Sequence, residues 1–163
     1  MNEESGASLP LSPETLEMLR AYLARPRNAG SESAGEVRDP PAELSAYLAR
    51  AGQPFSRLLL ERIRESGESE VAVYKRAGVD RKLFSKIRGD PHRQPKKSTV
   101  IAFALALRLS VEETRDLLAS AGYAFSDSAT FDLIIRFFIE RGEYDRFRIN
   151  DALYAFKQPI LAV

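Results

Sequence analysis

Apolar residues recur along this chain at intervals of three and four positions, which is the period of an amphipathic α-helix. In the first such stretch Ser12 stands where an N-cap is expected and Pro13 at the first helical position, and the apolar face carries Leu16, Leu19 and Leu23. No stretch alternates apolar and polar residues as a half-buried strand would. The pattern predicts an all-α protein with essentially no sheet.

From residue 55 to residue 122 the helical period continues almost without a break and predicts five helices. The first three end at glycines, which are natural C-terminal caps: Gly67, Gly78 and Gly89. The fourth, within 96–109, is strongly apolar. The fifth begins at Ser110, which has capping-box spacing with Glu113.

The second and third of these helices have the spacing of a helix-turn-helix. A shared apolar seam is expected from Val73, Ala77, Val79, Phe84 and Ile87. Gly78 falls at the sharp turn between the helices, and Asp80 is placed to cap the second of them. Burial of the seam would leave an outward face on the helix over about 80–88, made of Arg81, Lys82, Ser85 and Lys86.

Residues 26–41 have no apolar period and are rich in Pro, Gly and Ser, so they are interpreted as a flexible linker. The linker divides the chain into an N-terminal tail with a short helix (1–25), a helical domain (42–122) and a C-terminal extension (123–163). The pentapeptide AYLAR occurs at 21–25 and again at 46–50. It indicates either two ordinary amphipathic helices or a duplicated docking helix for a partner.

The C-terminal extension contains a helix within 128–142 that is apolar on more than one face and ends at Gly142. A second short helix is expected over 149–156, before Pro159. A helix this apolar must be covered. We expect it to pack on the helical core; the alternative is a second copy of the chain, which would make it the interface of a homodimer.

The composition of the chain excludes several kinds of functional site. The chain has 163 residues, no cysteine and one histidine, His92, which excludes disulfides, thiolate metal sites and cysteine nucleophiles. Carboxylate pairs stand at helix starts, where capping alone favours them. We expect no enzyme activity, no metal site and no cofactor.

The chain has no apolar stretch long enough for a membrane span and no signal-peptide pattern, so a cytoplasmic location is expected.

Charge is distributed unevenly, although the net charge is only +1. Residues 71–97 hold nine lysines and arginines against Asp80 and Asp90, while the rest of the chain has more acidic than basic residues. This is the pattern of an anion-binding segment on an acidic body.

The segments AGVDRKLFSKIRG (77–89) and QPKKSTVIAFALALRLSVEETRDLL (94–118) resemble the phage-repressor-like helix-turn-helix family, the Cro and lambda-repressor (XRE) class. The resemblance covers about residues 55–120. It implies a five-helix lambda-repressor-like bundle, here with an extra N-terminal helix and two C-terminal helices. It also implies sequence-specific binding of double-stranded DNA, usually as a two-fold dimer. Tyr74 stands where the family usually has alanine, so we expect the packing of the two central helices to differ there.

By this resemblance the base-reading role goes to Arg81, Lys82, Ser85 and Lys86, and a DNA-backbone role to Lys96, Lys97 and Ser98. The chemistry of the residues agrees in part. The planar fork of Arg81 matches the two acceptors of guanine, and Arg93, Lys96 and Lys97 stand beside a helix N-terminus that favours phosphate. Lys75 and Arg88 are further expected backbone contacts. His92 is interpreted as solvated or adjacent to a phosphate.

The sequence therefore predicts a DNA-binding transcriptional regulator. A second hypothesis is an antitoxin-like or adaptor protein that binds a protein partner through residues 12–25, 42–50 or 131–156. RNA in place of DNA is a third alternative, and a homodimer is compatible with each.

Overall fold

The structure, a computed structural model, describes residues 11–24, 44, 46, 48 and 51–161, and this part of the chain is α-helical without a strand. The all-α prediction is thus confirmed for the described residues. The helices with defined bounds are α1 (Pro13–Leu23), α3 (Phe55–Ser66), α4 (Glu70–Arg76), α5 (Arg81–Gly89), α6 (Lys97–Ala106), α7 (Val111–Ser120), α8 (Thr130–Glu140) and α9 (Arg146–Ala155).

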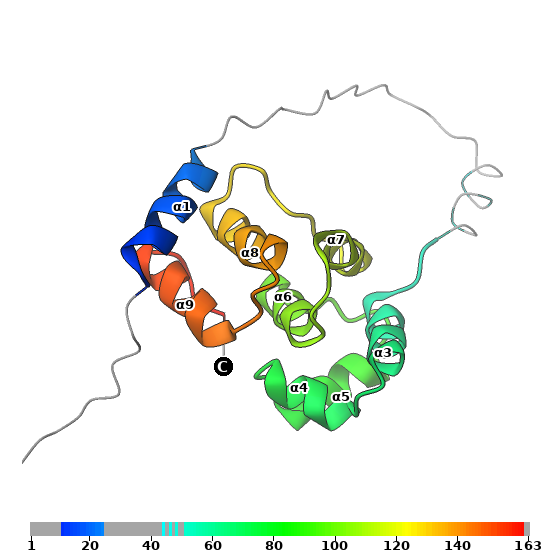
Figure 1. The fold of residues 1–163 in the computed structure, drawn as a ribbon. Coiled ribbons are helices and arrows are strands. Elements are labelled where there is room, and N and C mark those ends of the chain that lie inside the picture. Colours follow the sequence, from blue (N-terminus) through cyan, green and yellow to red (C-terminus); the bar gives the residue numbers. More distant parts are fainter. Residues whose placement is uncertain (1–10, 25–43, 45, 47, 49–50, 162–163) are drawn as a thin grey trace, which may run out of the picture.

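Helices α4 and α5 form the predicted two-helix unit at one edge of the molecule (Figure 1). All five residues of the predicted apolar seam are buried. Gly78 has φ of 70°, a left-handed conformation that glycine adopts without a Cβ penalty. Tyr74 is buried as well, and its ring centre lies 5.1 Å from that of Phe84. The aromatic pair forms part of the contact between α4 and α5.

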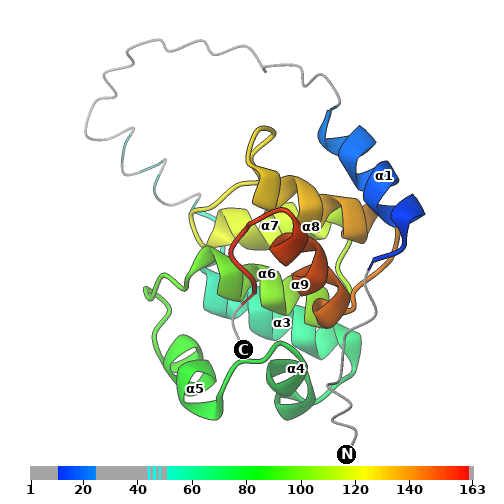
Figure 2. The same cartoon turned by 90° about the vertical axis from the view of Figure 1, so that its left-hand side faces the viewer.

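Helix α6 lies at the centre of the fold and contacts α4 and α7 (Figures 1 and 2). Every residue from Val100 to Ala106 is buried, as expected of a helix that is apolar on all sides. Helix α7 lies beside it and begins with the predicted capping box of Ser110 and Glu113. Helix α3 contacts α4, α5 and α7, and so joins the two-helix unit to the core.

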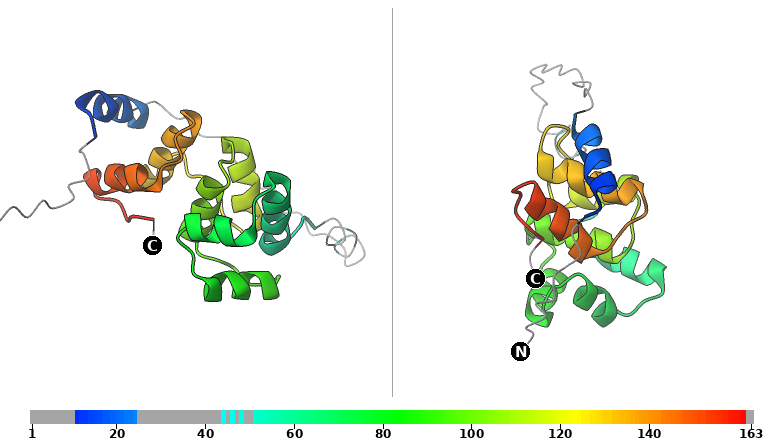
Figure 3. Two further views of the ribbon diagram at one scale, coloured as in Figure 1. Left: turned by 60° about the horizontal axis from the view of Figure 1, so that its bottom comes forward. Right: turned by 60° about the vertical axis from the view of Figure 1, so that its left-hand side comes forward.

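Helix α1 packs against α8, although more than 100 residues separate the two in sequence. Leu19 is fully buried, and the ring of Tyr22 meets that of Phe137 edge-on with centres 5.5 Å apart. The Tyr22 hydroxyl donates a hydrogen bond to Glu140 Oε1 at 3.0 Å. Figure 3 shows α1 at the end of the molecule away from α3. The N-terminal helix is therefore a wall of the C-terminal extension.

Two predictions fall largely outside the described residues. The predicted linker over 26–41 lies entirely outside them. The second AYLAR segment, expected to lie in an amphipathic helix, is described only in part: of residues 41–52 the structure describes 44, 46, 48, 51 and 52, of which the first three are helical. Leu44 and Leu48 are exposed.

The apolar side chains of α8 are covered within one chain, by α1, α7 and α9. Of the helices between residues 55 and 122, α7 contacts α8; packing on the core in place of a homodimer interface stays a prediction. The last helix differs from the prediction, because α9 begins at Arg146 and not at Ile149. Asp145 is its N-cap, and its Oδ1 accepts a hydrogen bond from the amide of Phe147 at 2.9 Å. No helix among the described residues is long and apolar enough to cross a membrane.

Candidate nucleic-acid interface

The outward face of α5 is the first part of the candidate interface. The side chains of Phe84 and Ile87 point into the core, and the opposite face exposes Arg81, Lys82, Ser85 and Lys86. The helix starts where predicted, because Asp80 Oδ1 accepts a hydrogen bond from the amide of Leu83 at 2.6 Å. Local sequence therefore places all four predicted base-reading residues on one exposed face.

The cations of this face are free to meet an external anion. Arg81, Lys82 and Lys86 form no ion pair with a carboxylate of the described residues. Arg88, one turn further along, differs because its Nη1 lies 2.7 Å from Glu70 Oε2. This ion pair ties the end of α5 to the start of α4. A DNA-backbone contact by Arg88 would have to share its guanidinium with Glu70.

The basic loop over 90–96 is held against the end of α7. Gln94 Nε2 donates a hydrogen bond to the carbonyl oxygen of Ala121 at 3.0 Å, and the Tyr123 hydroxyl donates to that of Pro95 at 2.8 Å. These contacts leave Arg93 and Lys96 exposed beside the N-terminus of α6. Neither has an ion-pair partner among the described residues. His92 is also exposed in this loop.

Lys97 lies in a different environment from the one expected for a DNA-backbone contact. Its Nζ lies 2.6 Å from Oδ2 of Asp132, a carboxylate buried to 1% exposure at the start of α8. The amide of Ser126 donates to the same oxygen at 2.6 Å. Lys97 therefore satisfies a buried charge and joins α6 to α8. Ser98, beside it, is half-buried.

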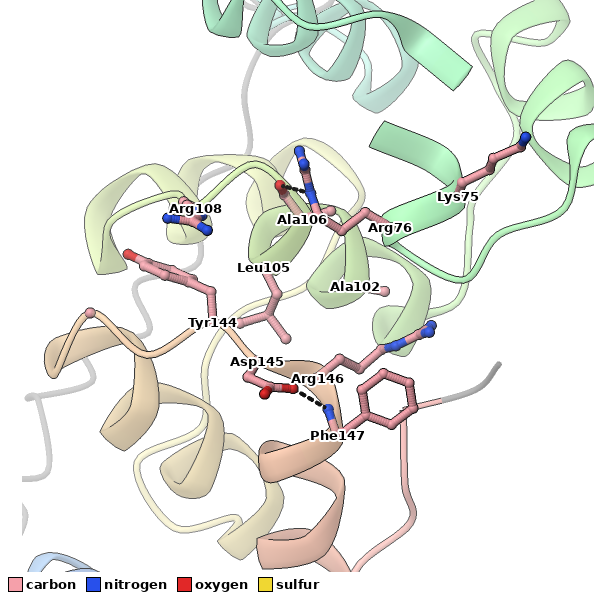
Figure 4. Close-up of a pocket in the computed structure, with 11 residues that line it drawn as sticks. Lys75, Arg76, Ala102, Leu105, Ala106, Arg108, Tyr144, Asp145, Arg146 and Phe147 are labelled. Atoms are coloured by element: carbon pink, nitrogen blue, oxygen red, sulfur yellow. Dashed lines mark hydrogen bonds between the residues drawn. The ribbon is translucent and has the colours of Figure 1, made fainter. Parts of the chain in front are cut away.

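Lys75 and its neighbour Arg76 are also removed from the face of α5. Both line a cleft between the end of α4, the end of α6 and the corner before α9 (Figure 4). Lys75 is exposed, whereas Arg76 pairs with Glu68 and donates from Nε to the carbonyl oxygen of Ala106 at 2.9 Å. Lys75 thus belongs to a second group of cations.

Sequence reasoning missed Arg146, the first residue of α9. Its Nη1 donates a hydrogen bond to the carbonyl oxygen of Ala77 at 3.0 Å, and its guanidinium lies over Gly78. Asp145 as an N-cap could have signalled a helix start at this position. Nothing in the local pattern signals a contact with residues 69 positions away.

The described residues contain no group of histidine, aspartate or glutamate side chains that could hold a metal ion. Comparison with protein-family models, with curated proteins and with solved structures found no match to this chain. Any function must therefore be argued from the geometry of this molecule itself.

Proposed function

We propose that this protein binds double-stranded DNA in a sequence-specific manner and regulates transcription, with α5 in the major groove. The observation that carries the proposal is the outward face of α5. Four side chains suited to base edges and phosphates share it, and its three cations have no carboxylate partner among the described residues. Unpaired cations grouped on one exposed face repel one another, and this repulsion destabilises the protein unless an anion neutralises them.

The residues divide into two roles. Arg81 is the first residue of α5. In a helix-turn-helix protein the N-terminal residues of the recognition helix contact base edges, and the planar guanidinium of an arginine there can bind both acceptors of a guanine. Lys82, Ser85 and Lys86 follow on the same face. Arg93 and Lys96 lie beside the first amides of α6 and are suited to phosphates, which position a protein on the duplex without reading sequence.

The test is selection of bound fragments from a pool of random duplex DNA, followed by sequencing. The unmodified chain should enrich one motif, and a palindromic motif would indicate that two copies bind together. Arg81→Ala should lower affinity for that motif by roughly 5- to 160-fold, the equivalent of about 1–3 kcal/mol for one base contact. Arg20→Ala removes the same charge from the exposed face of α1 and should leave the motif and the affinity unchanged.

Salt dependence separates the two roles. Arg93→Ala and Lys96→Ala should weaken binding to all sequences alike and each reduce the slope of log affinity against log salt by about 1. The proposal fails if no motif is enriched, or if Arg81→Ala and Lys86→Ala leave the enriched motif unchanged.

A second candidate function, an adaptor that binds a protein partner, is favoured by one observation on α9. Phe147 and Tyr154 are seven residues apart, and so lie on one face, with 72% and 80% of their surfaces exposed. Of the partner-binding surfaces considered from the sequence, the apolar faces of α1 and α8 are used within the chain itself. Absence of an enriched DNA motif, together with binding of a second, different protein that Tyr154→Ser abolishes, would favour this candidate.

A further inference from the structure

Helix α1 packs on one face of α8. Leu19 of α1 is fully buried, and Leu23 packs against the apolar core. The ring of Tyr22 meets that of Phe137 edge-on with centres 5.5 Å apart, and its hydroxyl donates a hydrogen bond to Glu140 Oε1 at 3.0 Å. We call this side of α8, which presents Phe137 and Glu140 to α1, the α1 face.

The side chains with which α1 makes these contacts occur a second time in the chain. The sequence LRAYLAR (19–25) is repeated as LSAYLAR (44–50), and the two copies differ only at Arg20 and Ser45. Arg20 is exposed on α1, so the difference falls outside the packed side of the helix. Three residues of the second AYLAR segment stand in the places of Leu19, Tyr22 and Leu23, namely Leu44, Tyr47 and Leu48.

Two leucines of the second AYLAR segment are exposed. Leu44 and Leu48 are helical and leave 48% and 62% of their surfaces accessible to solvent, whereas Leu19, the counterpart of Leu44, is fully buried. An amphipathic helix in a protein is stabilised mainly by packing of its apolar face. The second AYLAR segment therefore lacks, at these two residues, the kind of cover that α8 gives to α1.

A short connection ties the second AYLAR segment to α3. Only residues 51–54 lie between them, and so short a stretch spans at most roughly 18 Å when fully extended. The start of α3 is fixed in the core, because Phe55 is buried. Helix α1 lies at the end of the molecule away from α3 (Figure 3). These restraints favour the α1 face of a second copy over that of the same chain.

We propose that the α1 face of α8 also binds the second AYLAR segment of another copy of this protein. Leu44 then takes the place of Leu19, while Tyr47 packs on Phe137 and donates its hydroxyl to Glu140. Helix α1 is the internal competitor for this face, and its release allows self-assembly. The proposal does not depend on the proposed DNA binding.

The unmodified chain should keep α1 on α8 for two reasons. Helix α1 belongs to the same chain as α8, which raises its effective concentration above that of a separate molecule. Leu16 and Met18 of α1 are also partly buried. Pro41 and Glu43 stand at the corresponding positions before the second AYLAR segment and offer no such apolar contact. We therefore expect a monomer at micromolar concentration.

The first test releases α1 by substitution in the full chain. Leu19→Asp places a carboxylate at a fully buried position, which should detach α1 from α8. This variant should self-associate in analytical ultracentrifugation at concentrations where the unmodified protein is a monomer. Adding Leu44→Asp and Leu48→Asp should restore the monomer, as should an excess of a peptide of residues 12–25. Arg20→Asp introduces the same side chain on the exposed side of α1 and should remain a monomer.

The second test keeps α1 folded on α8. Tyr22→Phe removes only the hydrogen bond to Glu140, so α1 should remain in place but compete less well. A labelled peptide of residues 41–52 should bind this variant about two- to tenfold more tightly than it binds the unmodified protein, the equivalent of one hydrogen bond. A peptide with Tyr47→Phe should lose this gain. A peptide with Leu44→Ser and Leu48→Ser should not bind.

Three results would overturn the proposal. The first is self-association of Leu19→Asp that persists after Leu44→Asp and Leu48→Asp are added, because it would be nonspecific contact of exposed apolar surface. The second is a folded, monomeric Leu19→Asp variant that Leu44→Asp and Leu48→Asp destabilise, because the segment would then occupy α8 of its own chain. The third is equal affinity of the 41–52 peptide for Tyr22→Phe and the unmodified protein, which decides the question if Leu19→Asp unfolds in circular dichroism.

Discussion

The Nη1 atom of Arg146 donates a hydrogen bond to the carbonyl oxygen of Ala77 at 3.0 Å. The bond joins the first residue of α9 to the turn between α4 and α5. Ala77 is the C-cap of α4, so its carbonyl group is one of those that a helix end leaves without an intrahelical partner. The C-terminal extension therefore completes the two-helix unit, as well as packing beside it.

Loss of this contact should destabilise the fold. Arg146→Ala removes a charged donor from the carbonyl group of Ala77, a buried residue, and hydrogen bonds of this type contribute about 1.5–3 kcal/mol. Partial exposure of the arginine places the expected loss at the lower end. Arg148→Ala is the matched control, because Arg148 lies on the same helix and only forms an exposed pair with Glu143. Urea unfolding measures both variants, and equal midpoints would show that the bond adds no stability.

Gly78→Ala should cost more than its backbone conformation alone explains. An alanine at φ of 70° is strained by roughly 1–2 kcal/mol, and its methyl group would overlap the guanidinium of Arg146. Gly67→Ala meets the same backbone cost at φ of 73°, with open space around the new methyl group. The excess cost of Gly78→Ala should vanish when both glycine variants are made in an Arg146→Ala background. A persistent excess in urea unfolding would mean that the collision is not its cause.

Asp132→Asn should destabilise the protein by roughly 2–3 kcal/mol, because it leaves the ammonium group of Lys97 without its partner in a largely buried site. The value lies below that of a fully buried pair because Lys97 keeps 30% of its side-chain exposure. The additional change Lys97→Met should recover part of the loss, since it removes the unpaired charge. Asp127→Asn breaks an exposed pair with Arg136 and should cost about 0–1 kcal/mol. A larger loss for Asp127→Asn than for Asp132→Asn in chemical unfolding would contradict this account.

Tyr144 should make the protein sensitive to alkaline pH. Burial raises the pKa of its phenol above the usual 10.0, and the negative charge of Glu113 raises that pKa further, while Arg108 opposes the shift. A raised folded-state pKa gives stability that is fully present below the unfolded pKa and is lost as pH rises through the folded one.

The unmodified protein should therefore lose stability more steeply than Tyr144→Phe as the pH rises above about 10, the usual pKa of the phenol. Tyr144→Phe should also be less stable at every pH below that value, because it lacks the hydroxyl that donates to the carbonyl oxygen of Leu109. Tyr154→Phe, at an exposed position, serves as the control. Parallel stability curves for the unmodified protein and Tyr144→Phe would refute the titration of this group.

Features with a local cause could be predicted from the sequence. Ser12, Asp80 and Ser110 cap the helices that they were expected to cap, because an N-cap bond reaches only two or three residues along the chain. The apolar seam of α4 and α5 is buried as its period indicates. The outward face of α5 follows from the same period, since residues that are not turned inward must face solvent.

Other features required the tertiary structure, because they depend on segments that are distant in sequence. The placement of α1 on α8, the pairing of Lys97 with Asp132 and the cleft around Arg108 each bring such segments together. The local sequence around a lysine or arginine is the same kind of sequence whether its side chain binds a phosphate, a buried carboxylate or a backbone carbonyl group. By itself the sequence determined which helices form and which faces they bury. Only the packing of the helices decided which lysine and arginine side chains have no partner within the described residues, because the arrangement of the helices in space sets which groups such a long side chain can reach.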